Sequence, residues 1–176
     1  MSMAKKAAII IAIMIPVSLG SLLSVEASRN AILNSILEWK ADHVDIYFQE
    51  DSPNQLSRDM IKNSLYQPQY LPDGFAESET VKFGNTQRIK YKNKENVPII
   101  FDQTPLYEEG KTMVDSEHTT YKEITINGQK ASLFKAKTSN DKTYILWQRN
   151  KISFMLCSTV DQQELIKMAE STKIKE

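Results

Sequence analysis

The sequence has one cysteine, Cys157, among its 176 residues. A single cysteine excludes an internal disulfide framework and any zinc site built from several cysteines. The five glycines are isolated from one another, which excludes a phosphate-binding loop and a dinucleotide fingerprint. Core packing must therefore stabilise the fold, and we expect neither nucleotide hydrolysis nor a bound cofactor.

The chain has no excess of either charge, because 22 basic residues balance 22 acidic ones. A nucleic-acid partner would favour a basic surface, so none is expected. Hydrophobic residues make up 41% of the chain and charged residues 25%, a composition typical of a folded domain with its own core. One ordinary domain is expected after the N-terminal segment.

The N-terminal segment predicts export from the cytoplasm. Residues 7–25 carry no charge and follow Lys5 and Lys6. A helix of that length rises about 28 Å, close to the roughly 30 Å of bilayer hydrocarbon, and the two lysines keep its N-terminus inside. We therefore predict a single-pass cell-membrane protein whose C-terminal domain is extracytoplasmic. The alternative is a secreted protein whose signal peptide is cleaved after Ala27.

The region that follows is predicted to be helical. Apolar residues from Arg29 to Tyr47 fall mostly at helical spacing and indicate an amphipathic juxtamembrane helix, although residues 44–48 also alternate as a strand would. A short helix is expected between Leu56 and Leu65. The predicted organisation is a cytoplasmic tail (1–6), a transmembrane helix or uncleaved signal anchor (7–25), a juxtamembrane helical region (26–65) and an extracytoplasmic domain (66–176).

Strand signals dominate the domain itself. Asn127-Gly128 indicates a two-residue hairpin turn and Arg149-Asn150 a second one. A helix begins at about Asp161, which can cap it, and the polar stretch from Tyr107 to Thr119 is predicted to be a loop. Strands are expected at 75–83, 86–92, 97–103, 120–126, 130–136, 142–148 and 151–158.

These elements predict an α+β fold. We expect an antiparallel sheet of about six to seven strands, with the C-terminal helix of residues 161–171 packed on one face. In this prediction the N-terminal transmembrane helix precedes the domain and continues into the amphipathic helix.

Several short segments, taken in order, give the chain a family resemblance. They are Tyr70-Leu71-Pro72-Asp73-Gly74-Phe75, Ile100-Phe101-Asp102-Gln103, Ile124-Thr125-Ile126-Asn127-Gly128, Ile145-Leu146-Trp147 and residues 164–171. Through them the chain resembles the family of domains of unknown function numbered 4367, the extracytoplasmic domain of anti-sigma-factor-like membrane proteins of Gram-positive bacteria. The resemblance implies a sensory or envelope-associated module and supplies no catalytic residues. Relatives commonly carry a cytoplasmic zinc-containing anti-sigma domain, which is missing before Lys5, so direct sigma-factor inhibition is not expected.

A search for catalytic chemistry gives weak candidates. Asp115-Ser116-Glu117-His118 contains the residue types of a hydrolytic site, but neighbours in a loop do not place a nucleophile, base and orienter at bonding distance. A metal site would need His43 to approach His118 across a long stretch of chain. Cys157 lies in an apolar run that favours burial over reactivity. Two further patterns are the carboxylate pair Glu108-Glu109, predicted to be solvated, and the aromatic residues Tyr144, Trp147 and Phe154, predicted to belong to the core.

The most distinctive pattern is a basic stripe formed by Arg88, Lys90, Lys92 and Lys94. These residues alternate with Ile89 and Tyr91, which places the cations on one strand face. They could contact anionic lipid headgroups or anionic wall polymers. The simpler interpretation is the solvated face of an edge strand, with lysines that discourage aggregation.

The function expected from these features is that of a non-enzymatic, membrane-anchored extracytoplasmic module that senses or binds a component of the bacterial cell envelope. Its expected partners are the cytoplasmic membrane and another membrane or envelope protein. The alternative is a secreted envelope carrier or structural protein that binds an apolar ligand after signal-peptide cleavage.

Overall fold

The structure, a computed structural model, describes residues 35–48, 65–106 and 110–175. Within these ranges the chain is mostly β, and its one helix is α4 (Gln162–Glu170). The predicted α+β class is therefore wrong. The transmembrane helix expected at residues 7–25 lies outside the described residues, as does almost all of the helix expected at 56–65. In the described ranges no helix is long and apolar enough to cross a membrane.

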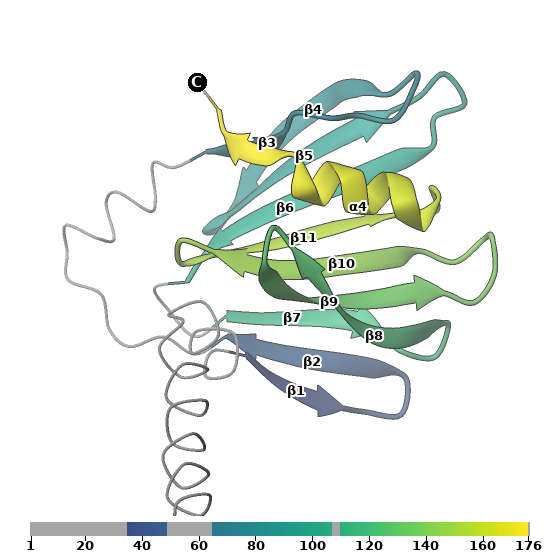
Figure 1. Ribbon diagram of the computed structural model, residues 1–176. Coiled ribbons are helices and arrows are strands. Elements are labelled where there is room, and N and C mark those ends of the chain that lie inside the picture. The colour runs from purple at the N-terminus through teal and green to yellow at the C-terminus, as the bar shows by residue number, and fades with distance from the viewer. Residues whose placement is uncertain (1–34, 49–64, 107–109, 176) are drawn as a thin grey trace, which may run out of the picture. The chain divides into compact units, whose positions relative to one another are not determined.

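A seven-stranded antiparallel sheet forms the centre of the domain. All seven strands predicted from the sequence are present and all of them join this sheet. In spatial order they are β4 (Ala76–Phe83), β5 (Thr86–Lys92), β6 (Pro98–Pro105), β11 (Ile152–Ser158), β10 (Thr143–Arg149), β9 (Gln129–Ala136) and β8 (Thr119–Ile126) (Figure 1). Hairpins join most neighbours along the chain, and β11 enters between β6 and β10.

Two tight turns fix the register of these hairpins. Asn127 and Gly128, with φ of 49° and 80°, form the predicted turn between β8 and β9. The turn between β10 and β11 uses Asn150 and Lys151, with φ of 51° and 61°, so it lies one residue later than predicted. Positive φ at both central residues matches the twist of the flanking strands.

The main core lies on the face of the sheet that α4 crosses (Figure 1). Leu165, Met168 and Ala169 of the helix are buried against apolar residues of β5, β6, β9, β10 and β11. Asp161 caps the helix as predicted, because its carboxylate accepts a hydrogen bond of 2.8 Å from the backbone N–H of Gln163. The short strands β3 (Tyr66–Pro68) and β12 (Thr172–Ile174) then pair and hold the two ends of the main segment together.

A second sheet corrects two sequence predictions. It consists of β1 (Ser35–Trp39), β2 (His43–Phe48) and β7 (Gly110–Asp115), in the order β1-β2-β7. The predicted amphipathic helix over residues 29–47 is therefore wrong for its described part. Val44 and Ile46 lie on the same face of β2 and are both buried, and β7 pairs with β2 where a loop was predicted.

The small sheet packs against the other face of the large sheet, called the inner face here. Val44, Ile46 and Val114 form a second core cluster with Phe134 and Leu146 of β9 and β10. The large sheet thus has a core on each face. The small sheet has three strands and the large sheet has seven, so the part of the inner face near β5 and β6 extends beyond the second cluster.

Candidate functional site

The residues of the predicted basic stripe lie in two different environments. Strand β5 places Arg88 and Lys90 on the inner face, opposite the buried Ile89 and Tyr91. Lys90 forms an ion pair of 2.7 Å with Glu79 of β4, and Arg88 is paired with Asp102 of β6. Lys92 ends the strand and Lys94 follows it; both are exposed. Contact of the stripe with an anionic surface stays a prediction, and two of its four cations already have acidic partners.

The Arg88–Asp102 pair has the fork geometry of a bidentate ion pair. Arg88 Nε and Nη2 donate hydrogen bonds of 2.7 Å and 2.6 Å to the two carboxylate oxygens of Asp102. Only 9% of the Asp102 side chain is exposed, against 29% for Arg88. Hydrogen bonding to Asp102 raises the pKa of Arg88, so the guanidinium is charged at any physiological pH. The pair is therefore a rigid, neutral unit that holds its atoms in fixed positions.

A groove of about 220 Å³ opens over this pair, at the part of the inner face beyond the second core cluster. Its floor comes from β5, β6 and β11, and its walls come from the end of β4 and from β7 of the small sheet. We call it the Arg88 groove, and it is lined by Phe83, Thr86, Arg88, Asp102, Thr104, Thr112, Ser153 and Met155.

The register of the strands arranges the polar groups of the Arg88 groove in two rows. Thr86 and Thr104 share a hydroxyl hydrogen bond of 2.8 Å, and Thr104 lies opposite Ser153, so three hydroxyls cross the sheet together. Arg88 and Asp102 form the adjacent row. In the described part of the chain, the hydroxyls of Ser153 and Thr112 have no hydrogen-bond partner. The groove can therefore offer donors and acceptors from both sheets to a ligand.

An aromatic ring lies at the rim of the groove. Phe83 is 47% exposed at the end of β4, and the guanidinium carbon of Arg88 lies 4.9 Å from its ring centroid. This distance is within the range of a cation–π contact. The contact holds the ring beside the ion pair and leaves much of its surface open to a ligand.

Cys157 is close to the Arg88 groove but does not line it. The thiol belongs to the same face of β11 as Ser153 and Met155 and is buried, with 4% of the residue exposed. Burial raises its pKa to about 11. The residue is therefore a neutral thiol at physiological pH, which does not favour a nucleophilic role.

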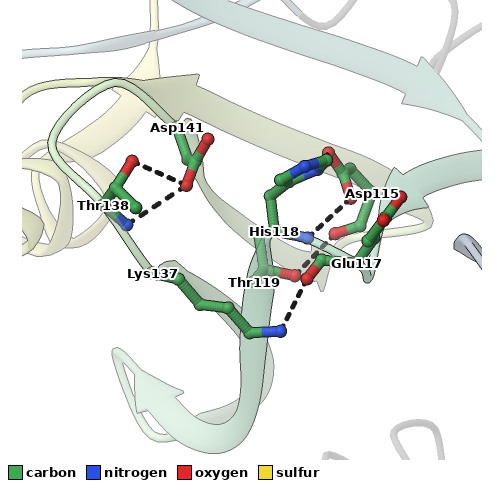
Figure 2. Close-up of polar contacts among 7 residues, drawn as sticks. All are labelled: Asp115, Glu117, His118, Thr119, Lys137, Thr138 and Asp141. Atoms are coloured by element: carbon green, nitrogen blue, oxygen red, sulfur yellow. Dashed lines mark hydrogen bonds and ion pairs between the residues drawn. The ribbon is translucent and has the colours of Figure 1, made fainter.

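The predicted hydrolytic cluster lies in the connection between β7 and β8 (Figure 2). Both oxygens of Asp115 contact His118, since one accepts from its backbone N–H at 3.0 Å and the other lies 2.9 Å from its ring Nδ1. Thr119 donates its hydroxyl to the Asp115 carbonyl at 2.5 Å instead of contacting the ring. These hydrogen bonds stabilise a tight turn. Among the described residues of the turn, no hydroxyl is hydrogen-bonded to the imidazole of His118.

The electrostatics of this turn depend on the Asp115–His118 contact. The hydrogen bond to Asp115 raises the pKa of His118, and the His118 backbone N–H lowers the pKa of Asp115. Both groups are largely exposed, so the pair contributes little to stability. Figure 2 also shows Lys137, which donates to the Glu117 carbonyl at 2.6 Å, and Asp141, which instead accepts from Thr138.

The fold brings Asp42 and His43 next to the turn of Asp115 and His118, an approach that the sequence did not indicate. His43 lies opposite Asp115 in the backbone register of β2 and β7. The Ser116 N–H donates a hydrogen bond of 3.1 Å to the Asp42 carbonyl. His43 itself contacts Asp42 at 2.6 Å. Even so, the described residues contain no group of three side chains positioned to hold a metal ion.

The three aromatic residues singled out from the sequence belong to the two core clusters. Trp147 and Phe154 stack in the main core with ring centroids 5.2 Å apart, and Tyr144 packs against the second cluster. Glu108 and Glu109 lie outside the described residues.

The sequence analysis did not identify Asp102, the acidic partner of Arg88 in the groove. Asp102 interrupts the apolar run of Ile99, Ile100 and Phe101, and a carboxylate in a buried strand is a signal that a partner is needed. Thr112 was missed because its strand was predicted to be a loop. Nothing local in the sequence indicates that Thr112 and Arg88 line the same groove, because the two belong to different sheets.

Comparison with known proteins identifies the family. Residues 65–172 match the family described as domain of unknown function DUF4367. This range contains all seven strands of the large sheet, the helix α4 and every residue of the Arg88 groove. No curated protein matches the chain. Because the match covers more than half of the 176 residues, the chain belongs to the DUF4367 family.

Proposed function

We propose that this protein is a non-enzymatic, extracytoplasmic binding module of the bacterial cell envelope, and that its ligand occupies the Arg88 groove. The observation that carries the proposal is the groove itself, in which an ion pair and a row of hydroxyls lie open beside an aromatic rim. Concave sites with a few fixed polar groups are the usual form of ligand sites. The fixed pair can orient a ligand without rearranging.

The location outside the cytoplasm rests on the sequence. The uncharged stretch of residues 7–25 after Lys5 and Lys6 supports export. Retention of this stretch would anchor the domain at the cytoplasmic membrane, in line with the extracytoplasmic, anti-sigma-factor-like context that the resemblance implies. The apolar-carrier alternative is less well supported, because Phe83 and Met155 are the apolar side chains of a groove that is otherwise polar.

The proposal can be tested by photo-crosslinking the full chain in native cells. A photoreactive phenylalanine analogue replaces Phe83 at the groove rim, and the matched control replaces Tyr121, an aromatic residue on β8 that is 40% exposed. We expect an adduct from position 83 that disappears when Asp102→Asn is added. An adduct that survives this change, equal adducts at both positions, or no adduct at position 83 would contradict the proposal.

Fractionation addresses the location separately. Intact-mass measurement of a C-terminally tagged chain in the membrane fraction should show a mass that includes residues 5–27 if the domain is anchored. A soluble chain that begins at Ser28 would instead support the secreted form.

A further inference from the structure

The chemistry of the Arg88 groove indicates which class of ligand it takes. Its charges cancel, because the single cation Arg88 is bonded to the single anion Asp102. A ligand with a net charge would have to compete with this internal pair and would gain little. The groove therefore favours an uncharged, strongly hydrogen-bonding ligand.

The remaining polar groups match a ligand rich in hydroxyls. Thr86, Thr104, Thr112 and Ser153 each supply a group that both donates and accepts. The carboxylate of Asp102 has further acceptor sites, and Arg88 uses two of its five N–H groups on Asp102. Fixed planar acceptors and donors next to hydroxyls can bind neighbouring ligand hydroxyls in pairs.

The volume of the groove and the side chains at its rim further restrict the class of ligand. The volume of about 220 Å³ is below the roughly 300–1,000 Å³ of sites for drug-sized molecules, so one ring-sized unit fits. Phe83 and Met155 supply apolar surface against which the C–H face of such a ring can pack. The groove is open to solvent, so the neighbouring units of a longer chain can extend out of it.

We propose that the Arg88 groove binds one sugar unit of an uncharged saccharide. This inference rests on the proposed function, and it names the ligand class of the same site. A saccharide presents hydroxyls at its edge and C–H groups on its faces, which is the combination that the two polar rows and the rim of the groove complement. An extended peptide is the competing occupant and is treated as an outcome of the test.

The groove contains its own reporters for this test. Thr86, Thr104, Thr112 and Met155 carry methyl groups at the floor and wall, and Met113 and Met168 provide reference methyls. Met113 is 59% exposed on the other face of β7, and Met168 is a buried residue of α4. Methyl-labelled full chain in detergent is titrated with the N-acetylglucosamine tetramer, with maltotetraose and with a neutral alanine-rich peptide.

We expect at least one saccharide to shift the four groove methyl signals in a saturable way while the two reference signals stay in place. The variant Thr104→Val keeps the shape of the side chain and removes its hydroxyl, and it should weaken binding roughly three- to tenfold. The matched control Thr125→Val removes an exposed hydroxyl on β8 and should leave the affinity unchanged.

Three results would overturn the inference: no saccharide shifts, shifts spread over both reference methyls, or groove shifts produced only by the peptide. If the photo-crosslink at position 83 still depends on Asp102, such results reject the saccharide and leave the binding module in place. Loss of both signals rejects the inference together with the proposed function.

Discussion

Arg88 on β5 and Asp102 on β6 lie directly opposite each other and share two hydrogen bonds, of 2.7 Å and 2.6 Å, on the inner face of the large sheet. The carboxylate is more deeply buried than the guanidinium, with 9% of its side chain exposed against 29%. This asymmetry determines what happens when either partner is removed, because a buried charge without a partner is costly and a charge that can reach water is not.

Arg88→Ala should therefore destabilise the protein more than Asp102→Ala does. We expect losses in the free energy of unfolding of about 2 and about 1 kcal/mol, and a double variant that costs less than the sum. Urea denaturation followed by intrinsic tryptophan fluorescence measures all three. The control Lys90→Ala breaks the exposed pair with Glu79 and should cost less than about 0.5 kcal/mol. Equal losses for Lys90→Ala and Arg88→Ala would show that the buried pair contributes no more to stability than the exposed pair.

The turn at Gly128 gives a prediction that depends on backbone conformation alone. Its φ is 80°, and a Cβ added there would meet no atom within 4 Å, so no clash contributes. Gly128→Ala should lower the free energy of unfolding by about 1 kcal/mol, because an L-residue is strained in this region. Thr125→Ala in the same hairpin should have less than half this effect in the same denaturation experiment. A neutral Gly128→Ala would mean that the turn relaxes to negative φ.

The seven strands of the large sheet were predictable because their signals are local. Alternation along each strand and the turn at Asn127-Gly128 specify hairpins between neighbours in sequence. The small sheet was not predictable in the same way. Val44 and Ile46 alternate as in a strand, but their partner β7 is more than 60 residues away and looked like a polar loop.

The Arg88 groove was only half predictable for a related reason. The sequence marks Arg88 as part of a basic stripe, but the fold converts that cation into one member of a neutral pair by placing Asp102 opposite it. The floor of the groove joins three strands, and its wall comes from a second sheet. Such a site exists only once the register between distant segments is known.

The aromatic centre of the main core should be the most sensitive part of the fold to truncation. Phe154 is fully buried, and its ring centroid lies 5.2 Å from those of Tyr66 and Trp147 and 5.8 Å from that of Phe101. Phe154→Ala should cost about 3–5 kcal/mol through lost burial and the cavity it leaves. Phe83→Ala removes the same ring from the groove rim and should cost less than about 1 kcal/mol. Thermal unfolding of the two variants compares them directly, and similar losses would contradict this account of the core.

In the turn of Asp115 and His118, the ring Nδ1 of His118 lies 2.9 Å from Oδ2 of Asp115. The hydrogen bond to Asp115 raises the pKa of His118. A titration of the imidazole by NMR should therefore give a midpoint above the ordinary value of about 6.5, and Asp115→Asn should lower it. Glu123→Gln, which removes a charge on β8, serves as the control and should leave the midpoint unchanged.

The sign of the linked stability effect follows from the direction of this shift. A histidine whose pKa is higher in the folded state stabilises the fold below its unfolded pKa, and the contribution is lost as pH rises through the folded pKa. Asp115 stays ionised in the acidic part of that window, because its pKa is lowered by the His118 backbone N–H. The wild-type protein should therefore exceed His118→Ala in stability by more near pH 6 than near pH 8. The opposite trend in urea denaturation at the two pH values would show that the imidazole is not bonded to Asp115 in solution.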